Sequence, residues 1–339
     1  MSTPHEGLAD DEVVAAQRFE LPRPDLSHWR VGNTGAEGVW RFEGTAPGRE
    51  MLVTALVHGN ELCGAWALHE ALHAGLRPRR GTLTLAFVNL AAFDRFDADD
   101  RHAARFVDHD LNRLWGAMPW CTASAPPSLE QQRVLELLPF VERSQWLLDL
   151  HSMHEPGPPL GLVGPLPHHA QVALRLGAPA LLVSDSGHRA GCRLRDHGAY
   201  GDAAADEYFS LLVECGWHGA LSSRSVALDM LARFLVSGNC IDAADVPATW
   251  FDFEVGMRRQ CIVRVTDAVT VAEGAPPRFA QPWISGETIE AAGTLLGWNG
   301  GEPFHTPYER CVLIMPTLVH ATPGATLMRL GREEGAGLS

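Results

Sequence analysis

The stretch MLVTALVHGNELCGAWALHEALHAG, residues 51–75, decides the fold class. Its first seven residues, 51–57, are apolar apart from one threonine, and a run of this length and character is typical of a buried strand. The residues from about Glu61 to Ala74 are rich in Ala and Leu, which favour a helix. The stretch therefore predicts a strand that leads directly into a helix.

The same alternation recurs further along the chain. Residues 128–144, SLEQQRVLELLPFVERS, have helical spacing of apolar residues. Four more apolar runs of strand length follow residue 80: TLTLAFV (82–88), QWLLDL (145–150), APALLVS (178–184) and YFSLLV (208–213). Strands without polar alternation, separated by helices, predict an α/β fold with a mostly parallel or mixed sheet and helices on both faces.

The two ends of the chain differ from this pattern. Residues 28–44, HWRVGNTGAEGVWRFEG, predict a hairpin of two β-type runs around a turn. After about residue 245, strand-like runs such as QCIVRVT and RCVLIMP alternate with Gly/Pro turns, and no helical pattern remains. We therefore expect a catalytic α/β domain over residues 1–249, with the N-terminal hairpin, and a smaller all-β domain over residues 250–339 that caps the site.

Composition narrows the classes of partner and location. The chain has 339 residues, with 27 Lys and Arg against 41 Asp and Glu, so the formal net charge is −14. This charge argues against nucleic acid or an anionic membrane as a partner. The polar, acidic start resembles no secretory signal, and no apolar run approaches the length of about 18 residues that a membrane helix needs. Seven scattered cysteines without C-x-x-C spacing fit reduced thiols, so we expect a cytoplasmic protein.

Two zinc signatures overlap in residues 56–75. His58 and Glu61 form H-x-x-E, whereas His69, Glu70 and His73 form H-E-x-x-H, the helical motif of zincin proteases. The zincin pattern needs a third ligand downstream. The metzincin form places a Gly three residues and a His six residues after its second His, where this chain has Leu and Arg. No Glu occurs between residues 70 and 130 to complete the alternative form, so we interpret this motif as part of an ordinary helix surface.

The other signature gains support from the ends of the predicted strands. His58 follows the first strand, Asn89 the second, His151 the third, and Glu214 the strand at 208–213. In open α/β sheets, ligands bind beyond the carboxyl ends of the strands. His58, Glu61 and His151 make a His₂Glu set that leaves a fourth position for water, the pattern of a catalytic zinc site. His154 is the alternative third ligand.

Four short motifs, in this order along the chain, resemble the succinylglutamate desuccinylase/aspartoacylase family, whose members are related to the zinc carboxypeptidases. They are HGNE, DLNR, DLHS and VECG, and the resemblance extends over about residues 50–330, including the β-rich tail. It implies an α/β catalytic domain, one zinc ion per chain, and hydrolysis of the amide bond of an N-acyl amino acid.

The resemblance also implies roles for single residues. Matched by position, His58, Glu61 and His151 are the zinc ligands, and Glu214 is the catalytic glutamate. In RFVDHDLNR, residues 105–113, the resemblance implies that Arg105 polarises the scissile carbonyl, that Asn112 and Arg113 hold a substrate carboxylate, and that Asp110 orients its neighbours. Tyr308 in the tail is a further candidate for substrate binding.

These roles agree with elementary chemistry. A carboxylate beside an acidified water accepts its proton and passes it to the leaving amine. A guanidinium supplies charge to a developing oxyanion, and a guanidinium with an amide suits a carboxylate.

One departure concerns the substrate. Aspartoacylases place an Arg about ten residues before the catalytic glutamate, but residues 199–213, AYGDAAADEYFSLLV, contain no Arg or Lys. This argues against N-acetylaspartate, and Arg189, Arg193 and Arg195 further back remain alternatives for that role.

The sequence therefore predicts a zinc-dependent amidohydrolase that deacylates a small anionic N-acyl amino acid. One alternative is a zinc metallocarboxypeptidase that acts on short peptides, and another is a metal-binding protein without turnover. The acyl group, the amino acid, the native metal and the assembly state, including a homo-oligomer, stay open.

Overall fold

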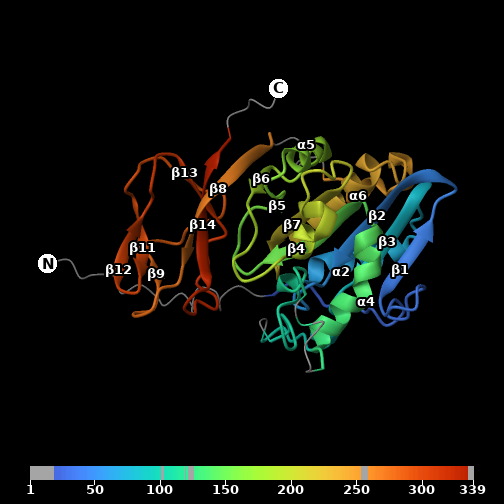
Figure 1. Ribbon diagram of the computed structural model, residues 1–339, viewed down its shortest axis with the longest axis horizontal. Coiled ribbons are helices and arrows are strands. Elements are labelled where there is room, and N and C mark those ends of the chain that lie inside the picture. The colour runs from blue at the N-terminus through green and yellow to red at the C-terminus, as the bar shows by residue number, and fades with distance from the viewer. Residues whose placement is uncertain (1–18, 101–102, 119, 121–125, 253–258, 335–339) are drawn as a thin grey trace.

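The computed structural model describes residues 19–100, 103–118, 120, 126–252 and 259–334. One eleven-stranded sheet runs through the molecule in the order β1-β3-β2-β4-β7-β5-β6-β8-β14-β13-β10, and β9, β11 and β12 form a separate small sheet (Figure 1). The strands are β1 Val39–Glu43, β2 Ala46–Ala55, β3 Arg80–Phe87, β4 Trp146–Met153, β5 Leu160–Leu162, β6 Leu181–Ser184, β7 Phe209–Trp217, β8 Cys261–Thr270, β9 Arg278–Phe279, β10 Thr288–Ile289, β11 Leu295–Asn299, β12 Glu302–His305, β13 Cys311–Ile314 and β14 Thr326–Glu333.

The centre of the large sheet is parallel. Strands β3, β2, β4 and β7 all run in the same direction, whereas β1 and β5 are antiparallel to their neighbours β3 and β7. The sheet is thus mixed, and the predicted fold class is confirmed.

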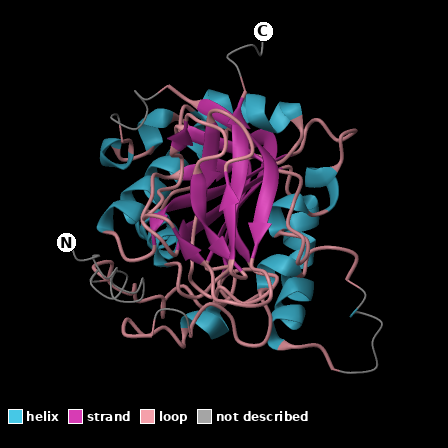
Figure 2. Cartoon of the chain, turned by 90° about the vertical axis from the view of Figure 1, so that its left-hand side faces the viewer, coloured by secondary structure: helices cyan, strands magenta, loops and turns pink. Residues whose placement is uncertain are grey.

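Helices cover both faces of this sheet (Figure 2). They are α2 Leu62–His73, α3 Leu90–Phe93, α4 Leu129–Arg143, α5 Pro167–Leu176 and α6 Leu221–Ser237, with short 3₁₀ turns at Leu111–Arg113, Leu194–Asp196, Gly198–Gly201, Ala243–Asp245 and Ala248–Trp250. Along β2, Met51 and Val53 face the apolar core that contains α2, α5 and α6, while Leu52 faces the core that contains α4. Because both faces of the strand are buried, its sequence shows no polar alternation.

The C-terminal strands continue the large sheet. Strand β8 pairs in parallel with β6, and β14 and β13 follow it in antiparallel pairs. A core cluster that contains Leu162, Val183, Val263 and Ile314 joins the two parts. The small sheet of β9, β11 and β12 lies at the far end of the molecule (Figure 1). The division at residues 249/250 stays a prediction, and the large sheet extends across it.

The predicted N-terminal hairpin is wrong. Residues 27–38 form turns, and β1 pairs with β3 instead of with the residues before it. Asn33 explains the difference, because its side chain accepts a hydrogen bond from the Arg41 N–H at 2.7 Å and donates one to the Arg41 carbonyl at 2.9 Å. One amide side chain thus makes the two bonds that a partner strand would make.

The order of the strands creates a crevice at one edge of the sheet. The chain leaves β2, passes through α2 and returns as β3 on one side of β2, and β4 then pairs on the other side of β2. Such a switch in direction opens a crevice beyond the carboxyl ends of the two flanking strands, here β2 and β4.

Two further observations concern membrane-spanning helices and the cysteines. None of the helices in the described ranges has the length and apolar character to cross a membrane. The six cysteines within these ranges all carry free thiols.

Candidate active site

The loop after β2 is shaped to place two side chains at this crevice. Leu56 has a positive φ of 60°, which turns the chain away from the direction of the strand. At Gly59 a β-carbon would lie 2.3 Å from the backbone nitrogen of Phe93, so only glycine fits there. Glu61 then begins α2 as its N-cap, but its side chain makes no capping hydrogen bond. The carboxylate is therefore available to the crevice between its two histidine neighbours.

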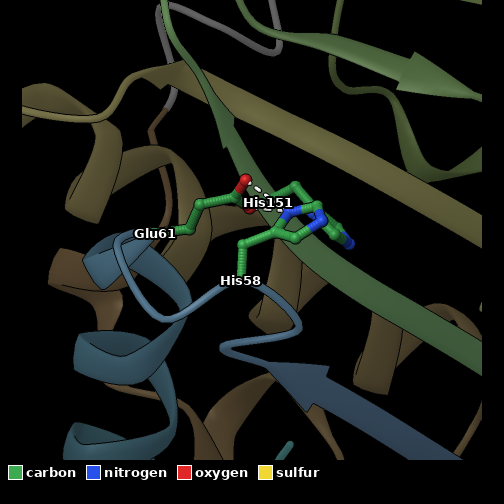
Figure 3. Close-up of side chains that lie close together, drawn as sticks. All are labelled: His58, Glu61 and His151. Atoms are coloured by element: carbon green, nitrogen blue, oxygen red, sulfur yellow. Dashed lines mark hydrogen bonds and ion pairs between the residues drawn. The ribbon is translucent and has the colours of Figure 1, made fainter. Parts of the chain in front are cut away.

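His58, Glu61 and His151 converge at this point (Figure 3). Glu61 Oε1 lies 2.7 Å from His58 Nδ1, and its Oε2 lies 2.8 Å from His151 Nδ1. The three side chains are almost fully buried, with exposed fractions of 3%, 2% and 1% in chain order. Within the described part of the chain, they form the only group of three metal-capable side chains whose ligand atoms all lie within 4.8 Å of one another.

The outer nitrogen of each histidine faces another carboxylate. His58 Nε2 lies 3.0 Å from Asp110 Oδ1, and His151 Nε2 lies 2.9 Å from Asp149 Oδ2. A carboxylate accepts, so in a neutral ring the proton sits on Nε2 and the lone pair of Nδ1 points to the centre of the group. Histidines that ligate metals are held in this way in most proteins. The donor set therefore fits a divalent cation.

The charges around the group favour a cation as well. Burial alone would lower the pKa of His151, but the carboxylates of Asp149 and Glu61 raise it well above its ordinary value. Burial alone would raise the pKa of Glu61, yet His58 and His151 hold it well below its ordinary range. The site thus attracts positive charge, which a bound divalent cation would supply.

Glu214 lies beside this group on the neighbouring strand. It is the register partner of His151 in the pairing of β4 with β7, and it is only 8% exposed. Its Oε2 atom is buried and has no hydrogen-bond partner among the described residues. Burial and the negative charge of Glu61 raise the pKa of Glu214 to about 8. A buried carboxyl group with an unsatisfied oxygen and a raised pKa is typical of a proton-transfer residue.

Two predicted arginines share one carboxylate at the mouth of the site. Arg105 donates from Nη2 to Asp110 Oδ2 at 3.1 Å, and its Nη1 lies 3.6 Å from Glu61 Oε1. Arg113 is only weakly paired, since its Nη2 lies 3.9 Å from the same Asp110 oxygen. Burial lowers the pKa of Arg113 to about 10 against the opposing effect of Asp110. The side-chain oxygen of the adjacent Asn112 accepts from the Leu194 N–H at 2.9 Å, which fixes the amide in place.

These side chains line one cavity of about 160 Å³. Its wall consists of His58, Glu61, Arg105, Asn112, Arg113, His151, Ser152, Met153, His154, Leu162, His188, Arg193, Leu212, Glu214, Met315, Thr317, Thr326 and Arg329. The cavity therefore brings together seven of the eight residues predicted for the site, and adds residues that follow position 300.

Arg329 was not predicted from the sequence. It comes from β14 and lines the cavity, and its side chain makes no hydrogen bond or ion pair with any residue that the structure describes. Arg193 also lines the cavity, but Asp185 and Asp196 neutralise it through bonds of 2.6 to 2.8 Å. The one sequence signal for Arg329 is its position between apolar residues in TLMRLG, where a charged side chain needs a reason.

Two other candidate residues lie away from the cavity. Tyr308 is not part of its wall: the hydroxyl bonds Thr266 Oγ1, and the ring packs under the Arg332 guanidinium at 3.6 Å. Asn89 caps the short helix α3 by accepting from the Ala92 N–H at 3.1 Å. The structure thus gives Tyr308 and Asn89 contacts with their local neighbours instead of a place in the cavity.

The H-E-x-x-H residues lie on α2, outside the group of three. The indole nitrogen of Trp29 donates to His69 Nδ1 at 3.0 Å, and Glu70 is paired with Arg224. Among the described residues, neither His69 nor His73 has two further metal-capable side chains in range. This agrees with the interpretation of the motif as helix surface.

Comparisons with known proteins agree with this picture. Residues 47–192 match the family model described as the succinylglutamate desuccinylase/aspartoacylase catalytic domain. No protein with a curated description matches the chain in sequence.

Several solved structures share the fold. A succinylglutamate desuccinylase from Vibrio cholerae superposes with a TM-score of 0.63 at 16% identity, covering 88% of this chain and 86% of that one. A succinylglutamate desuccinylase/aspartoacylase from Rhodobacter sphaeroides gives 0.63 at 16% identity, with 89% and 92% covered. The ectoine utilization protein EutE from Ruegeria pomeroyi gives 0.57 at 16% identity, with 86% and 87% covered. The chain thus has the fold of these proteins, and its residues 47–192 match the catalytic domain of the succinylglutamate desuccinylase/aspartoacylase family.

Proposed function

We propose that this protein is a zinc-dependent hydrolase that cleaves the amide bond of a small anionic N-acyl amino acid. One observation carries the proposal. The buried group of His58, Glu61 and His151 lies beside Glu214, a carboxyl group with an unsatisfied oxygen, and all four open into a cavity whose wall carries arginines. Deacylation is the activity for which the matched family is named.

The three proposed ligands fit zinc. Two imidazoles and one carboxylate are its common donors, and three protein ligands leave a position open for a water molecule or the substrate. Zinc bound there would acidify water and polarise a carbonyl group. The same donor set accepts other divalent ions, so the native metal is part of the proposal.

Glu214 has the properties of the general base. It accepts the proton of the attacking water and then delivers it to the nitrogen of the leaving amine. This role needs a carboxylate with a high proton affinity, because proton transfer is most efficient when the pKa lies near the working pH. The burial that raises the pKa of Glu214 to about 8 provides it.

Arg105 and Arg113 interact with different oxygen atoms of the substrate. Arg105 lies within 3.6 Å of Glu61, so it reaches the carbonyl oxygen next to the metal group and stabilises the negative charge that develops there. Arg113, with the Asn112 amide, holds the α-carboxylate of the amino acid. Arg329 adds a further cation, whose side chain has no hydrogen-bond or ion-pair partner in the described structure, and this supports an anionic substrate.

The cavity favours small substrates over peptides. Met315, Thr317, Thr326 and Arg329, all from the C-terminal strands and their loops, form part of its wall. A volume of about 160 Å³ is below the range of about 300–1,000 Å³ that is usual for drug-sized ligands. This disfavours a metallocarboxypeptidase. A metal-binding protein without turnover would not need the buried, unsatisfied oxygen of Glu214. A cytoplasmic location completes the proposal and rests on the pattern of cysteines.

A substrate screen tests the proposal directly. Zinc-loaded protein would be assayed for amine release from N-acetyl, N-succinyl and longer N-acyl amino acids, in parallel with blocked dipeptides. We expect hydrolysis of at least one N-acyl amino acid and none of the dipeptides. Release of C-terminal residues from the dipeptides would support the carboxypeptidase alternative instead.

The two arginines should affect different kinetic constants. We expect Arg113→Ala to raise KM with little change in kcat, because the carboxylate is bound in both the ground state and the transition state. Arg105→Ala should lower kcat by about 10²–10³-fold, because the charge on the carbonyl oxygen develops only on the way to the transition state. Steady-state kinetics on the best substrate of the screen measure both effects.

The carboxyl-amidated analogue of that substrate is the matching control. If Arg113 binds the carboxylate, the wild-type protein cleaves the amide analogue poorly, and Arg113→Ala handles the two compounds alike. Equal cleavage of acid and amide by the wild type would remove the amino-acid half of the proposal.

A further inference from the structure

A row of polar side chains connects β4 and β7 to Arg105. Ser152 Oγ lies 2.7 Å from His218 Nδ1, His218 Nε2 lies 3.2 Å from His154 Nδ1, and His154 Nε2 lies 3.4 Å from Arg105 Nη1. Ser152 on β4 and His218, the residue after β7, are both buried, and β4 and β7 pair next to His58, Glu61 and His151. The proposed chemistry uses none of Ser152, His218 and His154.

The arginine determines the direction of every hydrogen bond in this row. A guanidinium has only donors, so His154 must accept at Nε2 and carry its proton on Nδ1. That proton is donated to His218 Nε2, and His218 in turn carries its own proton on Nδ1. His218 Nδ1 then donates to Ser152 Oγ. These directions place the proton on Nδ1 of both rings.

We propose that His154 and His218 are positioning residues that hold the Arg105 guanidinium at the carbonyl side of the cavity through this directed row, which Ser152 ends. The identification of the carbonyl side rests on the proposed function. The row itself rests only on the contacts among these four side chains.

The row opposes the attraction of the Arg105 guanidinium to two nearby carboxylates. Its Nη2 donates to Asp110 Oδ2 at 3.1 Å, and Glu61 Oε1 lies 3.6 Å from its Nη1. Both carboxylates also serve the histidines of the metal group, at 2.7 to 3.0 Å. Without an acceptor on the other side, the guanidinium would move onto Glu61 or Asp110 and leave the position of the substrate carbonyl. His154 Nε2 supplies that acceptor.

Nitrogen NMR tests the row without any substrate. Zinc-loaded protein with ¹⁵N-labelled histidine, assigned by the His154→Gln and His218→Asn variants, would be recorded through the two-bond couplings that distinguish the tautomers. We expect a protonated Nδ1 and a bare Nε2 in both rings. A proton on Nε2 of either ring, or a doubly protonated ring at neutral pH, overturns the proposal whether or not a substrate has been found.

Kinetics test the effect on Arg105. Because small displacements of catalytic groups cost up to about 10²-fold in rate, we expect His154→Leu to lower kcat by about 10- to 100-fold with KM and zinc content unchanged. His154→Gln, which keeps an acceptor for the guanidinium, should recover part of this loss. In an Arg105→Leu background, His154→Leu should cause no further loss, since residues that act through one another are not additive.

The matched control is His320→Asn. The His320 ring lies 6.2 Å from the His154 ring but outside the row, and its φ of 53° suits asparagine. We expect wild-type kinetics. A full, additive loss for His154→Leu in the Arg105→Leu background, or a loss of zinc in the single variant, would show a structural role and overturn the proposal.

Discussion

Replacement of Glu214 by glutamine is expected to remove hydrolysis while zinc stays bound. General acid–base catalysis contributes about 10²–10⁴-fold, and kcat should fall by that factor because an amide of the same shape cannot accept the proton of water. Glu214 lies outside the three proposed metal ligands, so zinc content should stay near that of the wild type. Steady-state kinetics and metal analysis of the same preparation measure the two effects together.

Folding should not account for the loss. The buried Glu214 Oε2 makes no hydrogen bond in the described structure, so its replacement breaks no contact at that atom. We expect a melting temperature close to that of the wild type. Glu50→Gln is the matched control, since this half-buried glutamate lies in the middle of β2, five residues before the strand ends at Ala55. More than about a tenth of the wild-type kcat in Glu214→Gln would contradict the role of general base.

Loss of a ligand should have an equally large effect through the metal. His58→Ala removes one of the three proposed donors and leaves Glu61 with one histidine neighbour. Since even the loss of a residue that only supports a ligand costs about 10–100-fold in metal affinity, we expect the variant to lose its zinc on dialysis and its activity with it. Metal analysis after dialysis gives the result.

The chain offers its own control for this experiment. The double variant His69→Ala/His73→Ala removes both histidines of the H-E-x-x-H motif, which lie outside the metal group. We expect it to keep zinc and activity. If the double variant loses zinc while His58→Ala retains it, the assignment of the metal centre to H-x-x-E fails.

The grouping of His58, Glu61 and His151 was predictable because it depends on where the buried strands end along the chain. His58 and Glu61 come just after a buried strand, and His151 lies near the end of another. The apolar runs that mark these strands are visible in the sequence, and parallel strands bring their carboxyl ends to one edge.

The substrate side of the cavity was harder to predict, because it depends on strand pairing between distant segments. Arg329 reaches the cavity only since β8 pairs with β6 and β14 pairs with β8. The periodicity of apolar residues in the sequence does not indicate which of these strands pair with one another. The row from Ser152 to Arg105 likewise joins β4, the residue after β7 and a loop, which are between 49 and 66 residues apart in their contacts.

The N-terminal hairpin failed for a related reason. The turn-rich sequence between residues 28 and 44 suggested two strands, but the Asn33 side chain replaced one of them. The alternation of apolar residues does not reveal that a side chain, instead of a partner strand, makes the hydrogen bonds to a strand.

The large sheet continues without a break from β2 and β4, beside the three proposed metal ligands, to β14 at the C-terminal wall of the cavity. Four residue pairs connect β6 to β8, and β14 carries the Arg329 side of the wall in the same sheet. A hinge motion that separated the C-terminal strands from the rest of the sheet would have to break the backbone hydrogen bonds between β6 and β8 at each turnover. The strands on both sides of the cavity are therefore parts of one sheet, and we expect its walls to keep their spacing when a substrate binds. For the deacylase proposed above, a cavity that does not close around the substrate should select acyl chains by length, with a sharp cutoff.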